Sequence, residues 1–289
     1  MSNRANLINV FISNLESNNN IENLCLKEKN FIDSKYKTIN SRKTTYSEYR
    51  KFIKNSSLID DKKNIGLKIL KLSKNEASDY RENKNVQVYS KLNNLKFIKD
   101  IEGYIETGIF LIKKSSYIDK ILGFCCVTGR RPAEIGCSAD FSFVNKENLK
   151  FTGQLKTKSE ELKSYVIPCL MNTSDFLNEW RIFREQHTKN VIDKKEHSLN
   201  DFFSTELTKK FNSSYSKDMS MRVKKYFKNF LGDDVLTYNL RHTYATIATM
   251  KYNNMSDNLI HDDVFRAKIL GHNENDLDSV NTYKQFLKV

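Results

Sequence analysis

The clearest helical pattern lies in the middle of the chain. Apolar residues recur there at positions i, i+3, i+4, i+7 and i+8, the spacing of a helix face that packs against a core. They are Ile118, Ile121, Leu122, Cys125 and Cys126. Gly129 then supplies a residue that readily ends a helix, and Pro132 suits the first position of the next one. The tight turn between them carries Arg130 and Arg131. A purely structural turn has no need of two guanidinium groups, whereas an anion site does.

A second buried helix is predicted from Leu240 to Met250. One stripe of this helix is formed by Arg241, Tyr244, Ala245 and Ala248. An arginine on such a stripe is costly unless its charge meets an anion. The structural alternative is an internal salt bridge, either to Glu134 or to an Asp of the loop after Met255.

Between these helices the pattern changes to short runs typical of β-strands. They are Phe141–Val144, Leu149–Gly153 and Tyr165–Pro168. The loop Leu155–Ser159, between the second and third runs, is basic and carries Lys156 and Lys158. A lysine on a hairpin loop can bind a phosphate or protonate a leaving oxygen, and it can equally be a solvated turn residue. Helices resume at about Thr173–Arg184 and Met219–Leu231.

The N-terminal third differs in composition. The first 40 residues are rich in Asn and predict one short helix, followed by a polar loop at Ser17–Asn20. From Ser41 to Asp100, fifteen Lys or Arg stand against seven Asp or Glu and alternate with apolar residues at helical spacing. Such helices have basic faces suited to duplex phosphates, although a solvated surface is the alternative. The candidate DNA contacts in this window are Arg42, Lys43, Arg50 and Lys51.

These patterns predict two domains with a junction at about Asp100–Gly108. Residues 1–105 would form a basic helical DNA-binding domain, and residues 106–289 a second domain. The predicted fold class is mainly α with a small antiparallel β-sheet, an α+β arrangement.

Composition narrows the class of partner. The net charge of +13 and the pI near 9.3 indicate a polyanionic partner, most simply nucleic acid, although solubility alone is the alternative. The five cysteines contain no C-x-x-C pair and predict buried free thiols in a reducing compartment. The N-terminus lacks an apolar signal core, and no segment approaches the roughly 20 apolar residues of a membrane span. We therefore expect an intracellular protein outside the membrane.

Two short motifs near the end of the sequence, Leu270–His272 and Tyr283, complete an ordered series of five motifs. The series is TGRRPAE at Thr128–Glu134, Lys156 to Lys158, LRHTYAT at Leu240–Thr246, LGH at Leu270–His272, and Tyr283. In order and approximate spacing this series resembles the tyrosine recombinase superfamily, and the resemblance covers about Ser116 to Val289. It implies a helical DNA-binding domain and a catalytic domain that together form a C-shaped clamp on DNA.

Within that superfamily the chain is most similar to the telomere resolvases, or protelomerases. The Gly-Arg-Arg-Pro box at Gly129–Pro132 and the run after Leu270 resemble that branch, and Tyr238 stands where most members of the superfamily have a His. Two features depart from it. The chain is shorter than typical telomere resolvases, and it ends six residues after Tyr283, which leaves no room for an additional C-terminal domain.

The resemblance implies a chemistry for these residues. Tyr283 would attack a backbone phosphate, giving a 3′-phosphotyrosine link and a free 5′-hydroxyl without ATP. Arg131, Arg241 and His272 would stabilise charge on the non-bridging oxygens, with no need for a metal or cofactor. Lys156 would protonate the leaving oxygen.

Four further residues have supporting or alternative roles in this scheme. Lys158 could replace Lys156 as the acid, and Tyr238 would support the site as a hydrogen-bond donor. Arg130 would contact a neighbouring phosphate or pack, and Glu134 would orient Arg131.

Three functions are compatible with this set. The first is a telomere resolvase that converts a palindromic duplex into closed hairpin ends. The second is a tyrosine integrase that exchanges strands between two duplexes, and the third is an inactive DNA-binding derivative. The expected partner is double-stranded DNA with an inverted repeat, whose two-fold symmetry calls for two protomers.

Overall fold

The computed structural model describes residues 3–93, 96–155, 164–187, 206–253, 260–272 and 286–287. The chain divides into two compact units, Met1–Tyr89 and Ser90–Val289. Helices dominate both units, and the second contains a small antiparallel sheet, so the predicted fold class is confirmed. None of the helices within the described ranges has the length and apolarity needed to cross a membrane.

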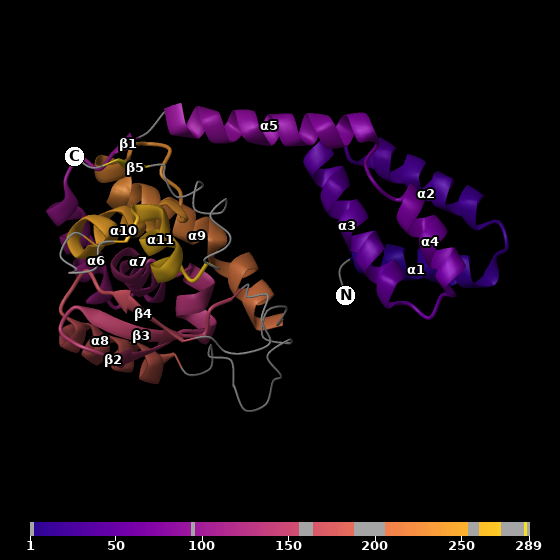
Figure 1. The fold of residues 1–289 in the computed structure, drawn as a ribbon. Coiled ribbons are helices and arrows are strands. Elements are labelled where there is room, and N and C mark those ends of the chain that lie inside the picture. The colour runs from indigo at the N-terminus through magenta and orange to yellow at the C-terminus, as the bar shows by residue number, and fades with distance from the viewer. Residues whose placement is uncertain are drawn as a thin grey trace. The chain divides into compact units, whose positions relative to one another are not determined.

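The first unit is helical (Figure 1). Its helices are α1 (Asn3–Ser17), α2 (Ile21–Lys35), α3 (Ile39–Asn55), α4 (Asp60–Ile69) and α5 (Lys74–Asn93), the last of which continues into the second unit. Their core includes Phe11 and Tyr49, whose ring centroids lie 5.5 Å apart. Where the sequence predicted one short helix in the first 40 residues, the structure has two. The second was missed because α2 buries only Ile21, Cys25 and Ile32, widely spaced among polar residues.

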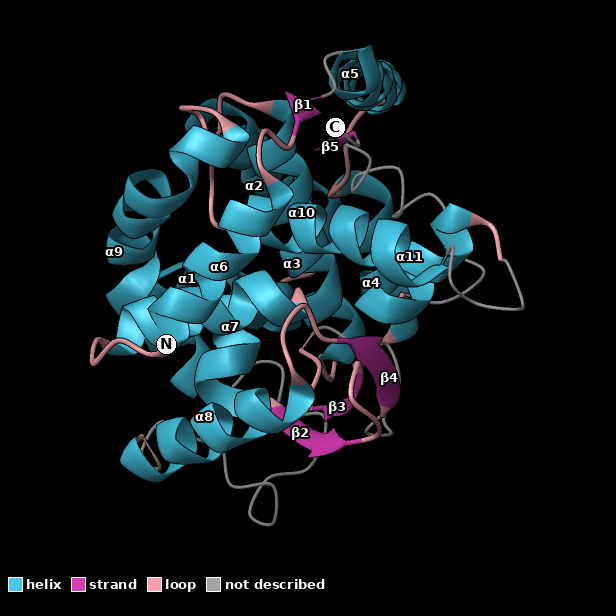
Figure 2. Cartoon of the chain, turned by 90° about the vertical axis from the view of Figure 1, so that its left-hand side faces the viewer, coloured by secondary structure: helices cyan, strands magenta, loops and turns pink. Residues whose placement is uncertain are grey.

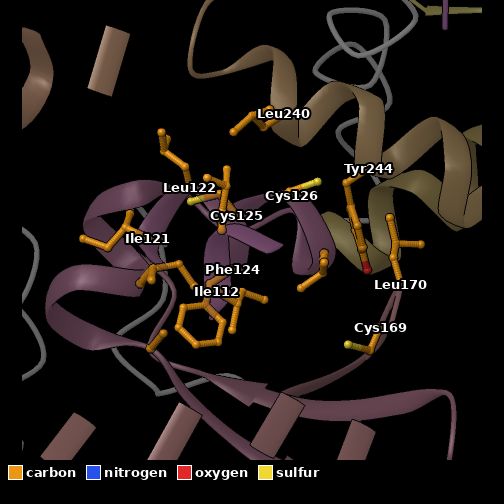
Figure 3. Close-up of a cluster of buried hydrophobic side chains, with 14 of the residues drawn as sticks. Ile112, Ile121, Leu122, Phe124, Cys125, Cys126, Cys169, Leu170, Leu240 and Tyr244 are labelled. Carbon is orange, nitrogen blue, oxygen red and sulfur yellow. The ribbon is translucent and has the colours of Figure 1, made fainter. Parts of the chain in front are cut away.

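The second unit is organised around α7 (Tyr117–Thr128), which lies among its other helices (Figure 1). All residues of α7 except the first are buried. The hydroxyl of Ser116 caps its N-terminus by accepting from the Asp119 amide, 3.4 Å away. Against α7 pack α6 (Ile101–Ile112), α9 (Glu206–Leu231) and α10 (Asn239–Ala248). Figure 3 shows side chains of α6, α7 and α10 meeting in one apolar cluster. The buried helix expected from the apolar spacing is therefore present.

A three-stranded antiparallel sheet follows α7 in the chain (Figure 2). Between them lies one turn of π-helix, η1 (Glu134–Ser138). The strands are β2 (Asp140–Phe143), β3 (Asn148–Thr152) and β4 (Tyr165–Pro168), and β3 is central. Phe141 opposes Phe151, which in turn opposes Tyr165. The helix α8 (Thr173–Gln186) packs on β2, with Phe141 edge-on to Trp180. The three predicted strands are thus confirmed to within a residue or so at each end.

The last described elements bring the end of the chain back to the beginning of this unit. After α10 come η4 (Thr249–Asn253) and α11 (Asp262–Leu270). The short strand β5 (Phe286–Leu287) pairs in parallel with β1 (Lys96–Phe97) and also contacts α10. Strand β5, which begins three residues after Tyr283, is therefore held by the unit to which α10 belongs.

The junction predicted at about Asp100–Gly108 falls inside this unit. Asp100 caps the N-terminus of α6 by accepting from the Gly103 amide at 2.9 Å. Tyr104 and Ile105 of α6 belong to the core of the unit. The boundary between the compact units lies earlier, between Tyr89 and Ser90. All five cysteines are buried free thiols, as predicted.

Candidate active site

Helices α7 and α11 of the second unit each end at a glycine, and their C-terminal ends lie close together. Gly129 ends α7 with φ 65° and Gly271 ends α11 with φ 68°, both in the left-handed region that favours glycine. A side chain at Gly129 would collide with the ring of Tyr244, and one at Gly271 would collide with Gln154 and Tyr165. Both glycines are therefore required by backbone conformation and by space.

The end of α11 closes in a Schellman motif, with hydrogen bonds from Gly271 N to Lys268 O (3.1 Å) and from His272 N to Ala267 O (2.9 Å). This motif leaves three consecutive carbonyls, those of residues 269, 270 and 271, without a backbone partner among these bonds. Each of the three carbonyls accepts a hydrogen bond from a side chain that is distant in sequence. The donors are Arg130 for Ile269 O (2.5 Å), Arg241 for Leu270 O (2.7 Å) and Gln154 for Gly271 O (2.9 Å).

The two arginines also bind the end of α7. Arg130 donates to Thr128 O at 3.1 Å, and Arg241 donates to Gly129 O at 2.6 Å. Each guanidinium thus joins the C-terminal carbonyls of two helices, where the negative ends of both helix dipoles favour a cation. This arrangement fixes the turn after α7 against the turn that carries His272.

Arg130 lies inside the protein. Its side chain is 1 % exposed, and its guanidinium stacks 4.7 Å from the Phe151 ring centroid and donates to the Tyr165 hydroxyl at 2.7 Å. Of the two roles expected for Arg130, the structure supports packing and corrects the assignment as a DNA contact. The sequence does not distinguish these roles, because neighbouring arginines on a turn look alike until the fold buries one of them.

Arg131 points in a more accessible direction. Its side chain is 26 % exposed, and its Nη1 donates to Glu134 Oε1 at 2.6 Å. The same carboxylate accepts from the Arg131 amide (2.8 Å) and from the Leu155 amide (3.2 Å). Arg131 Nη1 also donates to Leu155 O at 3.2 Å. Glu134 therefore orients Arg131, as predicted. By also accepting from the Leu155 amide, Glu134 holds the residue before Lys156 next to Arg131.

The charges of this cluster do not cancel. Glu134 is fully buried, and burial opposes its ionisation, but the neighbouring Arg131, Arg241 and Arg130 outweigh that effect and lower the pKa of the carboxyl. Among the residues that the structure describes here, three guanidinium groups act on this one carboxylate, so positive groups outnumber negative ones within the cluster. Buried cations need an anion or strong acceptors, so the arrangement is suited to bind a phosphate at the exposed edge of Arg131.

Gln154 and Tyr165 are not among the site residues predicted from the sequence. Gln154 is buried, and Tyr165, on β4, donates from its hydroxyl to Gln154 Oε1. Burial is the first cause of the raised pKa of Tyr165, so its hydroxyl stays protonated and keeps a proton to donate. A glutamine after a strand reads as a solvated loop residue, and only the folded chain brings it to Gly271.

The remaining predicted site residues are placed as follows. His272 lies directly after the glycine of the Schellman motif and is partly buried. Tyr238 is 44 % exposed and its ring lies edge-on to His242, with centroids 5.0 Å apart. Lys156, Lys158 and Tyr283 lie outside the described residues, so their roles stay predictions.

The predicted DNA contacts of the first unit all lie on α3. Arg42 pairs with Glu76 at 2.9 Å, and Arg50 donates to the carbonyl of Leu67, so both connect helices within the unit. Lys51 is exposed, and Lys43 is exposed with its ammonium 3.7 Å from the centroid of the Tyr80 ring. Over the described part of the chain, no group of three or more His, Cys, Asp or Glu could hold a metal ion.

Comparison with known families identifies the class. Residues 94–286 match the family model described as the telomere resolvase ResT/TelK catalytic domain, and this chain belongs to that family. The resemblance inferred from the sequence motifs is thereby confirmed.

Individual relatives agree with this assignment. The protelomerase of Klebsiella oxytoca phage phiKO2 is 27 % identical in an alignment of 261 residues, which covers 82 % of this chain. This chain spans only 39 % of the length of that relative.

Two solved structures share the fold. A selenomethionine protelomerase TelA covalently complexed with substrate DNA superimposes with a TM-score of 0.80 at 23 % identity, covering 100 % of this chain and 89 % of that one. A TelA mutant complexed with a DNA hairpin product gives a TM-score of 0.78 at 22 % identity, with 97 % and 87 % coverage.

The buried carboxylate gives a testable prediction for stability. Glu134→Gln keeps the size of the side chain and removes its charge. We expect the free energy of unfolding at neutral pH, measured by urea denaturation, to fall by about 3 kcal/mol, because three arginines lose their common anion. Glu147→Gln, at an exposed carboxylate, is the matched control and should leave stability unchanged within about 0.5 kcal/mol.

The same variant has a defined pH dependence. Because the pKa of Glu134 in the folded protein lies below its ordinary value of 4.5, the carboxylate stabilises the fold above that pH. The contribution is lost as the pH falls through the folded-state pKa. The difference in stability between wild type and Glu134→Gln should therefore shrink below pH 4.5. Equal stabilities at neutral pH would refute the anchoring role of Glu134.

Proposed function

We propose that this protein is a DNA breaking-and-rejoining enzyme of the telomere resolvase type, which forms covalently closed hairpin ends from a palindromic site. The observation that carries the proposal is the cluster of Arg130, Arg131 and Arg241 around the single buried Glu134. Its excess positive charge suits the extra negative charge that a phosphodiester gains during attack. Membership of the telomere resolvase family supports the same reaction.

In the proposed reaction the Tyr283 hydroxyl attacks the scissile phosphorus and gives up its proton to water. A phosphorus–oxygen bond to the tyrosine forms as the bond to the 5′-oxygen breaks, and the leaving oxygen takes a proton from Lys156; both proton transfers run in reverse when the strand is rejoined. Arg131, Arg241 and His272 stabilise the non-bridging oxygens. The 5′-hydroxyl of the opposite strand then attacks the phosphotyrosine and releases Tyr283. Each phosphodiester broken is replaced by one formed, so no ATP is consumed.

The reaction gives a direct test. A duplex with an inverted repeat, taken from the ends or junctions of the source replicon, is incubated with protein and run on a denaturing gel. We expect wild type to produce hairpins that renature at once, because each product strand is joined to its complement. Tyr283→Phe should produce none, and Tyr89→Phe, at an exposed tyrosine of the first unit, should match wild type.

Other products of that assay would support other functions. Products joined from two separate duplexes would establish an integrase instead. If no covalent adduct forms even on nicked DNA, the chain is a DNA-binding protein without this activity, and the proposed enzyme is refuted. Two protomers per inverted repeat are expected, measured as the mass of the protein–DNA complex in solution.

The general acid is proposed to be Lys156 and not Lys158. The support is the hydrogen bond between Arg131 and the carbonyl of Leu155, which places the backbone directly before Lys156 beside the phosphate-binding arginine. Lys158 lies two residues further along the loop. Because a general acid must lie close to the leaving oxygen, adjacency in sequence to Leu155 favours Lys156.

This assignment predicts that substitutions of the two lysines affect the rate of strand cleavage differently. Lys156→Ala should slow strand cleavage by about 100- to 10,000-fold, the range for loss of a general acid, and Lys158→Ala by far less. A substrate with sulfur in place of the bridging 5′-oxygen needs no proton to leave. It should restore cleavage by Lys156→Ala but not by Arg131→Ala, which lacks a phosphate donor. Restoration of Lys158→Ala alone would reverse the assignment.

We also propose that Tyr283 acts on the site of its own protomer. Phe286 of β5 follows Tyr283 by three residues, and β5 pairs with β1 and contacts α10, the helix of Arg241. Three residues of extended chain reach about 11 Å at most. The tyrosine is thus tethered to the unit whose arginines it would use.

Mixed dimers test this tethering. Tyr283→Phe and Arg241→Ala proteins are each expected to be inactive. If the tyrosine acts within its own protomer, mixing them leaves every site short of one group, and no cleavage should return. Cleavage at one of the two sites of each mixed dimer, about a quarter of all sites after random mixing, would mean that Tyr283 serves the partner.

A further inference from the structure

The peptide group between Gly271 and His272 is fixed at both of its polar atoms. Its N–H, on His272, donates to Ala267 O at 2.9 Å, and its C=O, on Gly271, accepts from Gln154 Nε2 at 2.9 Å. A peptide group is planar, so two opposed hydrogen bonds set the orientation of the whole plane and with it the Cα of His272. The first bond belongs to the helix cap. The second depends on the side chain of Gln154.

A directed series of hydrogen bonds orients that side chain. Arg130 Nη1 donates to the Tyr165 hydroxyl at 2.7 Å, so the hydroxyl proton is available to Gln154 Oε1, which accepts it. With its oxygen turned to Tyr165, the amide must present its NH₂ group to Gly271 O. The series therefore runs in one sense from a charged guanidinium to the carbonyl next to His272. Gln154 is 8 % exposed, and burial makes such bonds costly to leave unmade.

The spacing around Gly271 supports a close fit. A Cβ on this residue would collide with Gln154 Oε1 and with the Tyr165 hydroxyl. Glycine thus serves two purposes here, because it takes the left-handed conformation and admits the glutamine and tyrosine. The contact is between sequence-distant elements, since Gln154 follows β3 and Gly271 follows α11.

We propose that Gln154, oriented by Tyr165, is a positioning residue that holds His272 at the scissile phosphate. The role rests on the proposed strand-transfer function, because it matters only if His272 stabilises the reacting phosphate. Gln154 itself need not contact DNA. Its effect on the reaction passes through the Gly271–His272 peptide group.

A double-mutant cycle tests that route. The rate of covalent adduct formation is measured on nicked inverted-repeat DNA for wild type, Gln154→Leu, His272→Ala and the double variant. Gln154→Leu should lower the rate by about 10- to 100-fold when His272 is present, the loss expected for a displacement of about 1 Å. It should change the rate less than about twofold in the His272→Ala background, since nothing remains to be positioned. Equal losses in both backgrounds would overturn the proposal.

Matched variants separate positioning from folding. Gln186→Leu, at an exposed glutamine of α8, should leave the rate unchanged. Tyr165→Phe keeps Gln154 but removes the hydroxyl that orients the amide. This variant should lower the rate of adduct formation less than Gln154→Leu does, and again only when His272 is present. If Gln154→Leu does not fold, this second variant still tests the route, and a loss independent of His272 would again overturn it.

Amide hydrogen exchange provides a readout that does not require activity. In Gln154→Leu the peptide that contains Gly271 and His272 should exchange at least about tenfold faster, while peptides from α7 keep the wild-type rate. Unchanged exchange at His272 would refute the proposal. If wild type forms no adduct, the proposed function fails and the positioning role of Gln154 fails with it. If wild type is active but the cycle is additive, only the positioning role fails.

Discussion

Two buried guanidinium groups must each find acceptors, and the ends of two helices provide them. Arg130 and Arg241 both donate to the last carbonyls of α7 and to those of α11. A charge buried without partners costs several kcal/mol. If either helix end moved away, it would leave a buried guanidinium without acceptors at that cost. The rest of the second unit follows from this requirement. The glycines at 129 and 271 make the close approach possible, and the sheet supplies Phe151 and Tyr165 to cover Arg130.

The same requirement links stability to chemistry. A cluster with more positive than negative charge is unfavourable by itself, and the phosphate of the proposed reaction would relieve it. Helix C-termini reduce the penalty, because their dipoles favour cations before any substrate binds. Glu134 limits it further by neutralising one charge and by fixing Arg131 and Leu155 together. The site thus keeps its excess charge by distributing it over helix ends and one carboxylate.

Local patterns in the sequence predicted much of this architecture. The apolar spacing identified α7, Gly129 identified its end, and alternation identified the three strands. Motif order identified the family, because five short motifs in one order rarely coincide. The failures have a common physical cause. Helix α2 has few buried residues, Arg130 looks like Arg131, and Gln154 looks solvated, because each acquires its role only through contacts distant in sequence.

The cap of α11 separates what the fold needs at position 272 from what the reaction needs. The Schellman motif uses the backbone N–H of that residue, which every amino acid except proline possesses. In evolutionary terms, the side chain there could change while the cap persisted, so a lineage could lose the imidazole and still keep a folded protein. Gly271 has no such latitude, since both its conformation and its surroundings exclude a side chain. Gly271 therefore serves the fold, whereas the chemistry proposed above depends on the side chain that follows it.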